Sequence, residues 1–209
     1  MSKSLYSLVL TDEVVNEIDR LALRRNTNRS NLINQILAEY VSYVTPEMRI
    51  NSVFRSIEEV MNGSEIITAY VPQRNTMSLK SIIDYRYRPT VKYEVELFHV
   101  PKDNVIGRLT VALRTQSEVL IQRIDDFFNL WRYLENLLRG QDILYSIEPL
   151  RVTRAITANK ERTAEELAQA IAVYVDLMDK CMKGYLSGAL DEKDIASRLK
   201  AHIVREVLI

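Results

Sequence analysis

Cysteine, glycine and histidine are scarce in this sequence, and each shortage excludes a class of protein. The 209 residues include one cysteine, Cys181, together with five glycines and two histidines. A single cysteine cannot form an internal disulfide, which is typical of a protein kept in a reducing compartment. His99 and His202 lie far apart and have no cysteine or histidine at ligand spacing. The sequence therefore predicts no metal site, and because no glycine-rich phosphate loop occurs we also expect no cofactor.

Long apolar runs and net charge are absent as well. No apolar run reaches the ~20 residues that a membrane helix needs, and the N-terminus lacks the apolar segment of a signal peptide. We therefore expect a cytoplasmic protein without a membrane partner. Lys and Arg number 28, as do Asp and Glu, so no overall basic field indicates nucleic-acid binding. The acidic pairs Asp125-Asp126 and Glu165-Glu166 have the spacing of helix surfaces, so we predict no catalytic residues and no enzyme.

The first 63 residues favour one short strand and three helices. Residues 4–11, SLYSLVLT, have the composition of a strand. Residues 12–25 carry an apolar stripe at helical spacing, and Asn28 or Ser30 is placed to cap a second helix. Thr45 and Pro46 then suit the start of a third helix, which we expect to end at Gly63.

The predicted strand has no second strand to pair with for more than fifty residues. A lone strand exposes unpaired backbone groups along both edges. A unit of about 45 residues is also near the size at which one chain struggles to bury a core. Both problems disappear if two chains pair their strands, with Tyr6, Leu8 and Leu10 directed into the shared core.

Residues 3–43 resemble a ribbon-helix-helix module of the MetJ/Arc type. The resemblance rests on the strand, the hinge LTDEV at 10–14, an amphipathic helix, the turn RRNTNRS and the second helix SNLINQILAEYV. It implies an intertwined homodimer that lays its two-stranded ribbon in the major groove of DNA. By position, it implies that the outward strand residues face the bases and that the start of the second helix holds phosphates. These residues are Lys3, Leu5, Ser7 and Val9 on the strand, and Asn28, Arg29 and Ser30 at the helix.

The rest of the chain indicates an α+β domain. Residues 65–114 contain four β-rich segments, EIITAYV, SLKSIIDYRYR, TVKYEVELF and IGRLTVALR, which predict three or four antiparallel strands. Helices are expected at about 116–139, 163–186 and 191–207, the first two after the capping boxes TQSE (115–118) and TAEE (163–166). Residues 141–160 are either irregular or partly extended. The predicted organisation is thus a module at 1–45, a connecting helix at 46–63 and a larger domain at 64–209.

Charged residues of the predicted sheet allow two interpretations. Lys80, Asp84, Arg86 and Arg88 fall near one face of the segment SLKSIIDYRYR, with further charges on the neighbouring strands. They predict either a solvated face of ion pairs or a second surface for nucleic acid or an acidic ligand. We favour the solvated face.

The sequence as a whole predicts a DNA-binding transcriptional regulator that acts as a homodimer. Its larger domain would serve oligomerisation, or sensing of a protein or small-molecule effector. The alternative is a non-catalytic dimeric scaffold or adaptor, which uses the ribbon-helix-helix module for assembly and binds a protein partner. A role in DNA organisation or partition is a variant that the sequence does not separate from regulation.

Overall fold

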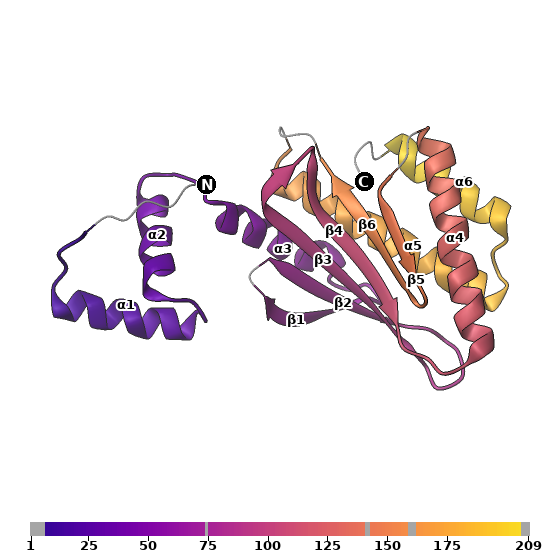
Figure 1. Ribbon diagram of the computed structural model, residues 1–209, viewed down its shortest axis with the longest axis horizontal. Helices are drawn as coiled ribbons and strands as arrows, with labels where there is room; N and C mark the ends of the chain where they lie inside the picture. Colours follow the sequence, from indigo (N-terminus) through magenta and orange to yellow (C-terminus); the bar gives the residue numbers. More distant parts are fainter. Residues whose placement is uncertain (1–6, 74, 141–142, 159–161, 206–209) are drawn as a thin grey trace. The chain divides into compact units, whose positions relative to one another are not determined.

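The computed structural model describes residues 7–73, 75–140, 143–158 and 162–205, and Figure 1 shows their arrangement within each unit. The chain divides into two compact units, residues 1–49 and 50–209. The described residues form α-helices and one antiparallel sheet, so the fold is mixed α+β as predicted.

The smaller unit contains the two helices that the sequence predicts. They are α1 (Asp12–Arg24) and α2 (Arg29–Tyr40), and α3 (Pro46–Met61) starts in this unit. Thr11 precedes α1 but makes no side-chain capping bond, whereas the Asn28 side chain accepts a hydrogen bond from the Asn31 amide. Asn26 between the helices has a φ of 51°, a left-handed conformation that commonly ends a helix. Ser7–Thr11 have no regular secondary structure in the single chain, and the rest of the predicted strand lies outside the described residues.

The larger unit is built on a six-stranded antiparallel sheet. Its strands are β1 (Ile67–Gln73), β2 (Thr76–Ile82), β3 (Thr90–Lys102), β4 (Val105–Leu113), β5 (Tyr145–Glu148) and β6 (Arg151–Thr157). They lie side by side in the order β1-β2-β3-β4-β6-β5. Three helices accompany the sheet: α4 (Glu118–Arg139), α5 (Ala164–Ser187) and α6 (Glu192–Arg205).

The sheet has one face in the core and one face open. Side chains alternate along β3, so that Val91, Tyr93, Val95 and Leu97 are buried while the residues between them are partly exposed. A row of inward side chains crosses the sheet from Leu79 through Tyr93, Val111 and Val152 to Ile147. Figure 1 shows α5 behind the sheet and α4 beyond its β5 edge. Ile50, Val53, Ile57 and Met61 of α3 join this core, so most of the predicted connecting helix belongs to the larger unit.

Three predictions for the larger unit need correction. The sheet does not end near residue 114, because 141–160 contain the hairpin of β5 and β6, and β6 pairs with β4 in the sheet interior. The strand predicted over 78–88 ends at Ile82, and the chain then turns until Thr90. Helix α4 is capped by Ser117, which accepts from the Leu120 amide, rather than by Thr115. The second capping box is correct: Thr163 and Glu166 exchange both bonds at the start of α5.

A buried ion network joins helices α4 and α5 to strands β5 and β6. Glu135 of α4 is fully buried and accepts two hydrogen bonds from the guanidinium of Arg154 on β6, at 3.0 and 2.8 Å. It also accepts from Arg139 Nε at 3.0 Å, from Tyr174 at 2.9 Å and from Tyr145. A buried charge is tolerated when it is paired and its remaining hydrogen-bonding capacity is used, and two arginines and two tyrosines donate to this one carboxylate. Nη2 of Arg139 is buried without a hydrogen-bond partner among the described residues.

The network keeps Glu135 ionised despite its burial. Desolvation raises the pKa of a buried carboxyl, but the charge and hydrogen bonds of Arg154, with help from Tyr145 and Arg139, outweigh it. The pKa of Glu135 is therefore lowered from its ordinary value of 4.5. Burial raises the pKa of both tyrosines well above 10, so they stay protonated and donate to the carboxylate.

Replacing Glu135 by glutamine is expected to lower the free energy of unfolding by about 3–5 kcal/mol, because it leaves the Arg154 and Arg139 charges buried without a counter-ion. Urea unfolding followed by tryptophan fluorescence measures this, since Trp131 lies in the same core. Glu148→Gln, at an exposed position of β5, is the matched control and should change stability by about 0.5 kcal/mol or less. Equal stabilities for the two variants would contradict a structural role for the network.

The lowered pKa also fixes the sign of a pH dependence. A carboxyl whose pKa is lower in the folded state contributes stability above its unfolded pKa and loses it as pH falls through the folded value. We expect the unfolding free energy of the wild type to decline below about pH 4.5 more steeply than that of Glu135→Gln. Urea titrations at several pH values check this, and parallel profiles for the two proteins would refute it.

Candidate functional site

The predicted DNA-facing residues lie in two places on the smaller unit. Ser7 and Val9 are exposed in the segment before α1, and the Val9 side chain is fully accessible. Lys3 and Leu5 lie outside the described residues. Asn28, Arg29 and Ser30 are together at the start of α2, as predicted from the capping pattern, and Arg29 and Ser30 are exposed.

The start of α2 offers backbone donors to an anion. The Asn28 side chain accepts from the Asn31 amide at 2.9 Å, which satisfies one of the free N–H groups of the first turn. The amides of Arg29 and Ser30 have no hydrogen-bond partner within the part of the chain that the structure describes. Free N–H groups and the positive end of the helix dipole favour a phosphate at this position.

Arg29 forms an ion pair that the sequence did not reveal. Its guanidinium donates to both carboxylate oxygens of Asp19 on α1, at 2.7 and 2.5 Å. This contact lowers the pKa of Asp19 and raises that of Arg29, so both groups stay charged. The pair joins α1 to α2 and places a carboxylate beside the cation expected to hold phosphate. Asp19 lies on the polar face of α1, and helical periodicity does not say which basic residue of the next helix it meets.

The smaller unit buries little of its apolar surface. Ala22, Leu32 and Ala38 are its buried apolar residues within 7–49. Its exposed large apolar side chains are Leu8, Val9, Leu10, Val14, Leu23, Ile36, Leu37, Tyr40, Val41, Tyr43 and Val44. Leu8, which the strand pattern directs into a core, is 62% accessible. Ser7–Leu10 also have no backbone hydrogen bond to any described residue.

The open face of the sheet fits the solvated interpretation in its central part. Lys92 and Glu94 of β3 form an ion pair at 2.6 Å, and Arg108 of β4 pairs with Glu96 across the strands at 2.5 Å. Asp84, Arg86 and Arg88 are not on this face, because β2 has ended before them. Exposed pairs of this kind add little stability.

The described residues contain no cluster of histidine, cysteine and acidic side chains suited to a metal ion. Cys181 is buried in α5, and burial raises the pKa of its thiol to about 11, which suits a packing role. None of the helices in the described ranges combines the length and apolar character needed to cross a membrane.

Comparison with known proteins identified no relative of this chain. No protein-family model, no curated protein and no solved structure matches the chain.

Proposed function

We propose that the protein is a DNA-binding regulator that acts as a homodimer through residues 1–49. The N-terminal segments of two chains pair as an antiparallel ribbon, and the outward side chains of this ribbon enter the major groove. One observation carries the proposal: the smaller unit exposes a large apolar surface and leaves the backbone of Ser7–Leu10 without described partners.

A second copy of the same segment would cover the exposed apolar surface and supply hydrogen-bond partners for the unpaired backbone. Pairing two strands supplies the hydrogen bonds that each edge lacks, and the same geometry brings Leu8 and Leu10 of both chains over the apolar sides of the helices. A protein partner of another kind would have to provide a strand and an apolar face in the same register. A symmetric dimer needs no further component.

Support for DNA as the ligand comes from the start of α2. The free amides of Arg29 and Ser30 suit a phosphate, and the Arg29 guanidinium is exposed beside them. Residues 1–45 carry equal numbers of basic and acidic side chains. The affinity for DNA must therefore depend on a few specific contacts to phosphates rather than on an overall positive field.

The scaffold alternative is favoured by apolar side chains outside the smaller unit. Tyr133 and Leu137 lie one turn apart on α4, and both are more than half accessible. They provide a strip on which a partner protein could pack. A protein that dimerises through residues 1–49 but binds no DNA would fit this alternative.

Leu8→Lys should weaken self-association at least a hundredfold in Kd. Each of the two symmetric sites then loses roughly 1.5–3 kcal/mol of apolar burial. Analytical ultracentrifugation over a range of concentrations measures the constant. Val9→Lys is the matched control, because neighbouring strand residues point to opposite faces. It should leave the dimer intact, and equal dissociation of both variants would contradict the ribbon register.

Asp19→Asn is expected to strengthen DNA binding, because it releases Arg29 for a phosphate. Arg29→Gln should weaken binding and reduce the slope of log K against log salt by about 0.9 for each phosphate that Arg29 neutralises in the wild type. Fluorescence anisotropy measures both effects, using duplexes that include the region upstream of the protein's own gene. The DNA proposal fails if the wild type binds none of these duplexes at low salt.

A change in net charge alone must be separated from the release of Arg29. Glu17 forms an exposed ion pair with Arg20 at 2.7 Å, so Glu17→Gln removes one negative charge and frees one arginine elsewhere on α1. This control should raise DNA affinity less than Asp19→Asn does. Equal gains would assign the effect to net charge rather than to Arg29.

A further inference from the structure

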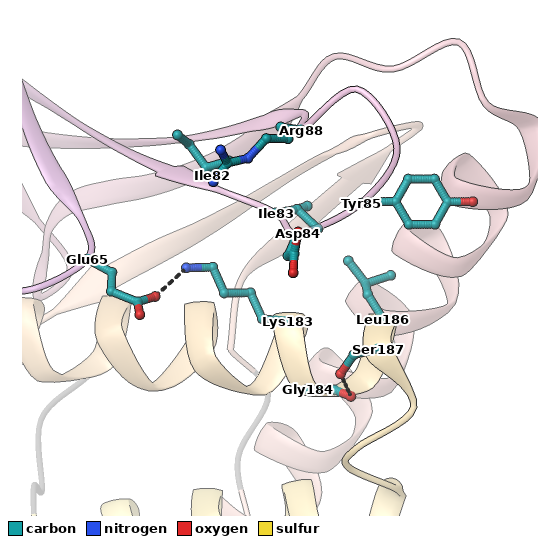
Figure 2. A pocket seen from close by; sticks show the side chains of 10 residues that line it. All are labelled: Glu65, Ile82, Ile83, Asp84, Tyr85, Arg88, Lys183, Gly184, Leu186 and Ser187. Carbon is teal, nitrogen blue, oxygen red and sulfur yellow. Dashed lines mark hydrogen bonds and ion pairs between the residues drawn. The ribbon is translucent and has the colours of Figure 1, made fainter.

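The larger unit contains a pocket that the DNA proposal does not use. It has a volume of about 670 Å³ and lies between the end of α5, the end of β2 and the loop 83–89. Figure 2 shows the side chains that line it. Known small-molecule pockets fall within roughly 300–1,000 Å³ and combine an apolar lining with a few placed polar groups. Here the apolar part consists of Ile82, Ile83, Tyr85 and Leu186.

Four charged side chains line the pocket, and two of them, Lys183 and Glu65, are already ion-paired. Lys183 of α5 pairs with Glu65 at 3.2 Å and with the buried Asp179 at 2.8 Å. Burial lowers the pKa of Lys183, but the hydrogen bonds and charges of Asp179 and Glu65 outweigh this, so the net shift is upward and the ammonium stays charged. Ser81 and Tyr93 also donate to Asp179, which fixes this corner of the pocket.

The remaining pair, Asp84 and Arg88, is not neutralised. Neither side chain makes a hydrogen bond or an ion pair with another described residue, although both belong to the same short loop. Figure 2 shows Arg88 running back over Ile82, whereas Asp84 turns toward α5. Both residues are exposed, so the pocket presents one free positive and one free negative group to solvent at separate positions.

The loop that carries Asp84 and Arg88 also has an unusual backbone conformation. Tyr87 and Arg88 have φ values of 66° and 44°, a left-handed conformation that favours glycine. The turn is closed by hydrogen bonds from the Arg88 amide to Tyr85 and from the Ile83 amide to Pro89. Two consecutive non-glycine residues in this conformation cost stability, and such strain clusters at active sites, ligand clamps and switch regions.

We propose that this pocket binds a small aliphatic zwitterion, a molecule with one carboxylate and one ammonium group. Its carboxylate pairs with Arg88 and its ammonium with Asp84, while its aliphatic part packs on Ile83 and Leu186. A dianion would meet the carboxylates of Asp84 and Glu65, and a dication would meet Arg88 and Lys183. A neutral apolar molecule would cover Asp84 and Arg88 without pairing them. A zwitterion complements both free charges.

The pocket lies entirely within residues 65–187, so the proposal does not depend on dimer formation or DNA binding. The test uses the full-length chain and three probes that separate the two charges by different lengths: L-leucine, L-leucyl-L-leucine and 6-aminohexanoic acid. Isothermal titration calorimetry and thermal unfolding follow binding up to ~10 mM, a range that covers millimolar Kd values. At least one probe should bind saturably and raise Tm. L-leucinamide and N-acetyl-L-leucine, each with one charge removed, should bind roughly tenfold more weakly than L-leucine or not at all.

Variants assign the binding to the pocket. Arg88→Gln and Asp84→Asn should each weaken the bound probe about tenfold or more. Arg86→Gln is the matched control, because Arg86 is exposed in the same loop and does not line the pocket. Arg88→Gly relieves the left-handed strain, so it should keep or raise Tm while weakening binding as much as Arg88→Gln does, which separates ligand recognition from folding. The proposal is overturned if no probe binds, or if binding survives in both Arg88→Gln and Asp84→Asn.

Discussion

The smaller unit is constrained by the apolar surface that it cannot bury alone. Its two short helices, of 13 and 12 residues, enclose Ala22, Leu32 and Ala38, whereas Leu8, Leu23 and Tyr40 stay accessible. Burial of apolar area is the main favourable term in folding, and below about 40–60 residues it barely offsets the loss of chain entropy. In the proposed dimer, the stability of this unit and its association with a second copy are therefore coupled. The dimer and DNA proposals depend on this coupling.

The larger unit buries its apolar surface within one chain. Its sheet is covered on one face by α3 and α5, and its inward row of side chains runs unbroken from Leu79 to Ile147. The polar groups in its interior are paired locally, Glu135 with two arginines and Asp179 with Lys183. These paired charges fix how α4 and α5 meet the strands, because a displaced helix would leave a buried ion without its partner.

Much of the fold was predictable because its signals are local. Caps at Asn28 and Thr163 and the apolar stripes identified the helices, and alternation identified β1 to β4. The sequence pattern allows either irregular or partly extended structure over residues 141–160 and does not assign β6 to the sheet. Arg154 occupies an inward position of β6, where alternation requires an apolar residue. Its partner Glu135 is on α4, so nothing near Arg154 in the sequence explains the substitution. The ion pair of Arg29 with Asp19 was not predicted either, because its two members are on different helices and the sequence does not show which residues meet. The loop of Tyr87 and Arg88 lacks the glycine or asparagine that marks a left-handed turn.

Under the proposed function, the balanced charge of the smaller unit makes assembly and DNA binding parts of one equilibrium. A single copy offers one Arg29 and two free amides, which is too little for stable binding against physiological salt. A symmetric dimer presents these groups twice at a fixed spacing, so the second contact forms without a new loss of translational freedom. DNA that binds the dimer and not the single chain must in turn stabilise the dimer. On this reasoning the exposed side chains of Leu8 and Leu10 influence DNA affinity as strongly as Arg29 does, although they touch no phosphate in the ribbon arrangement.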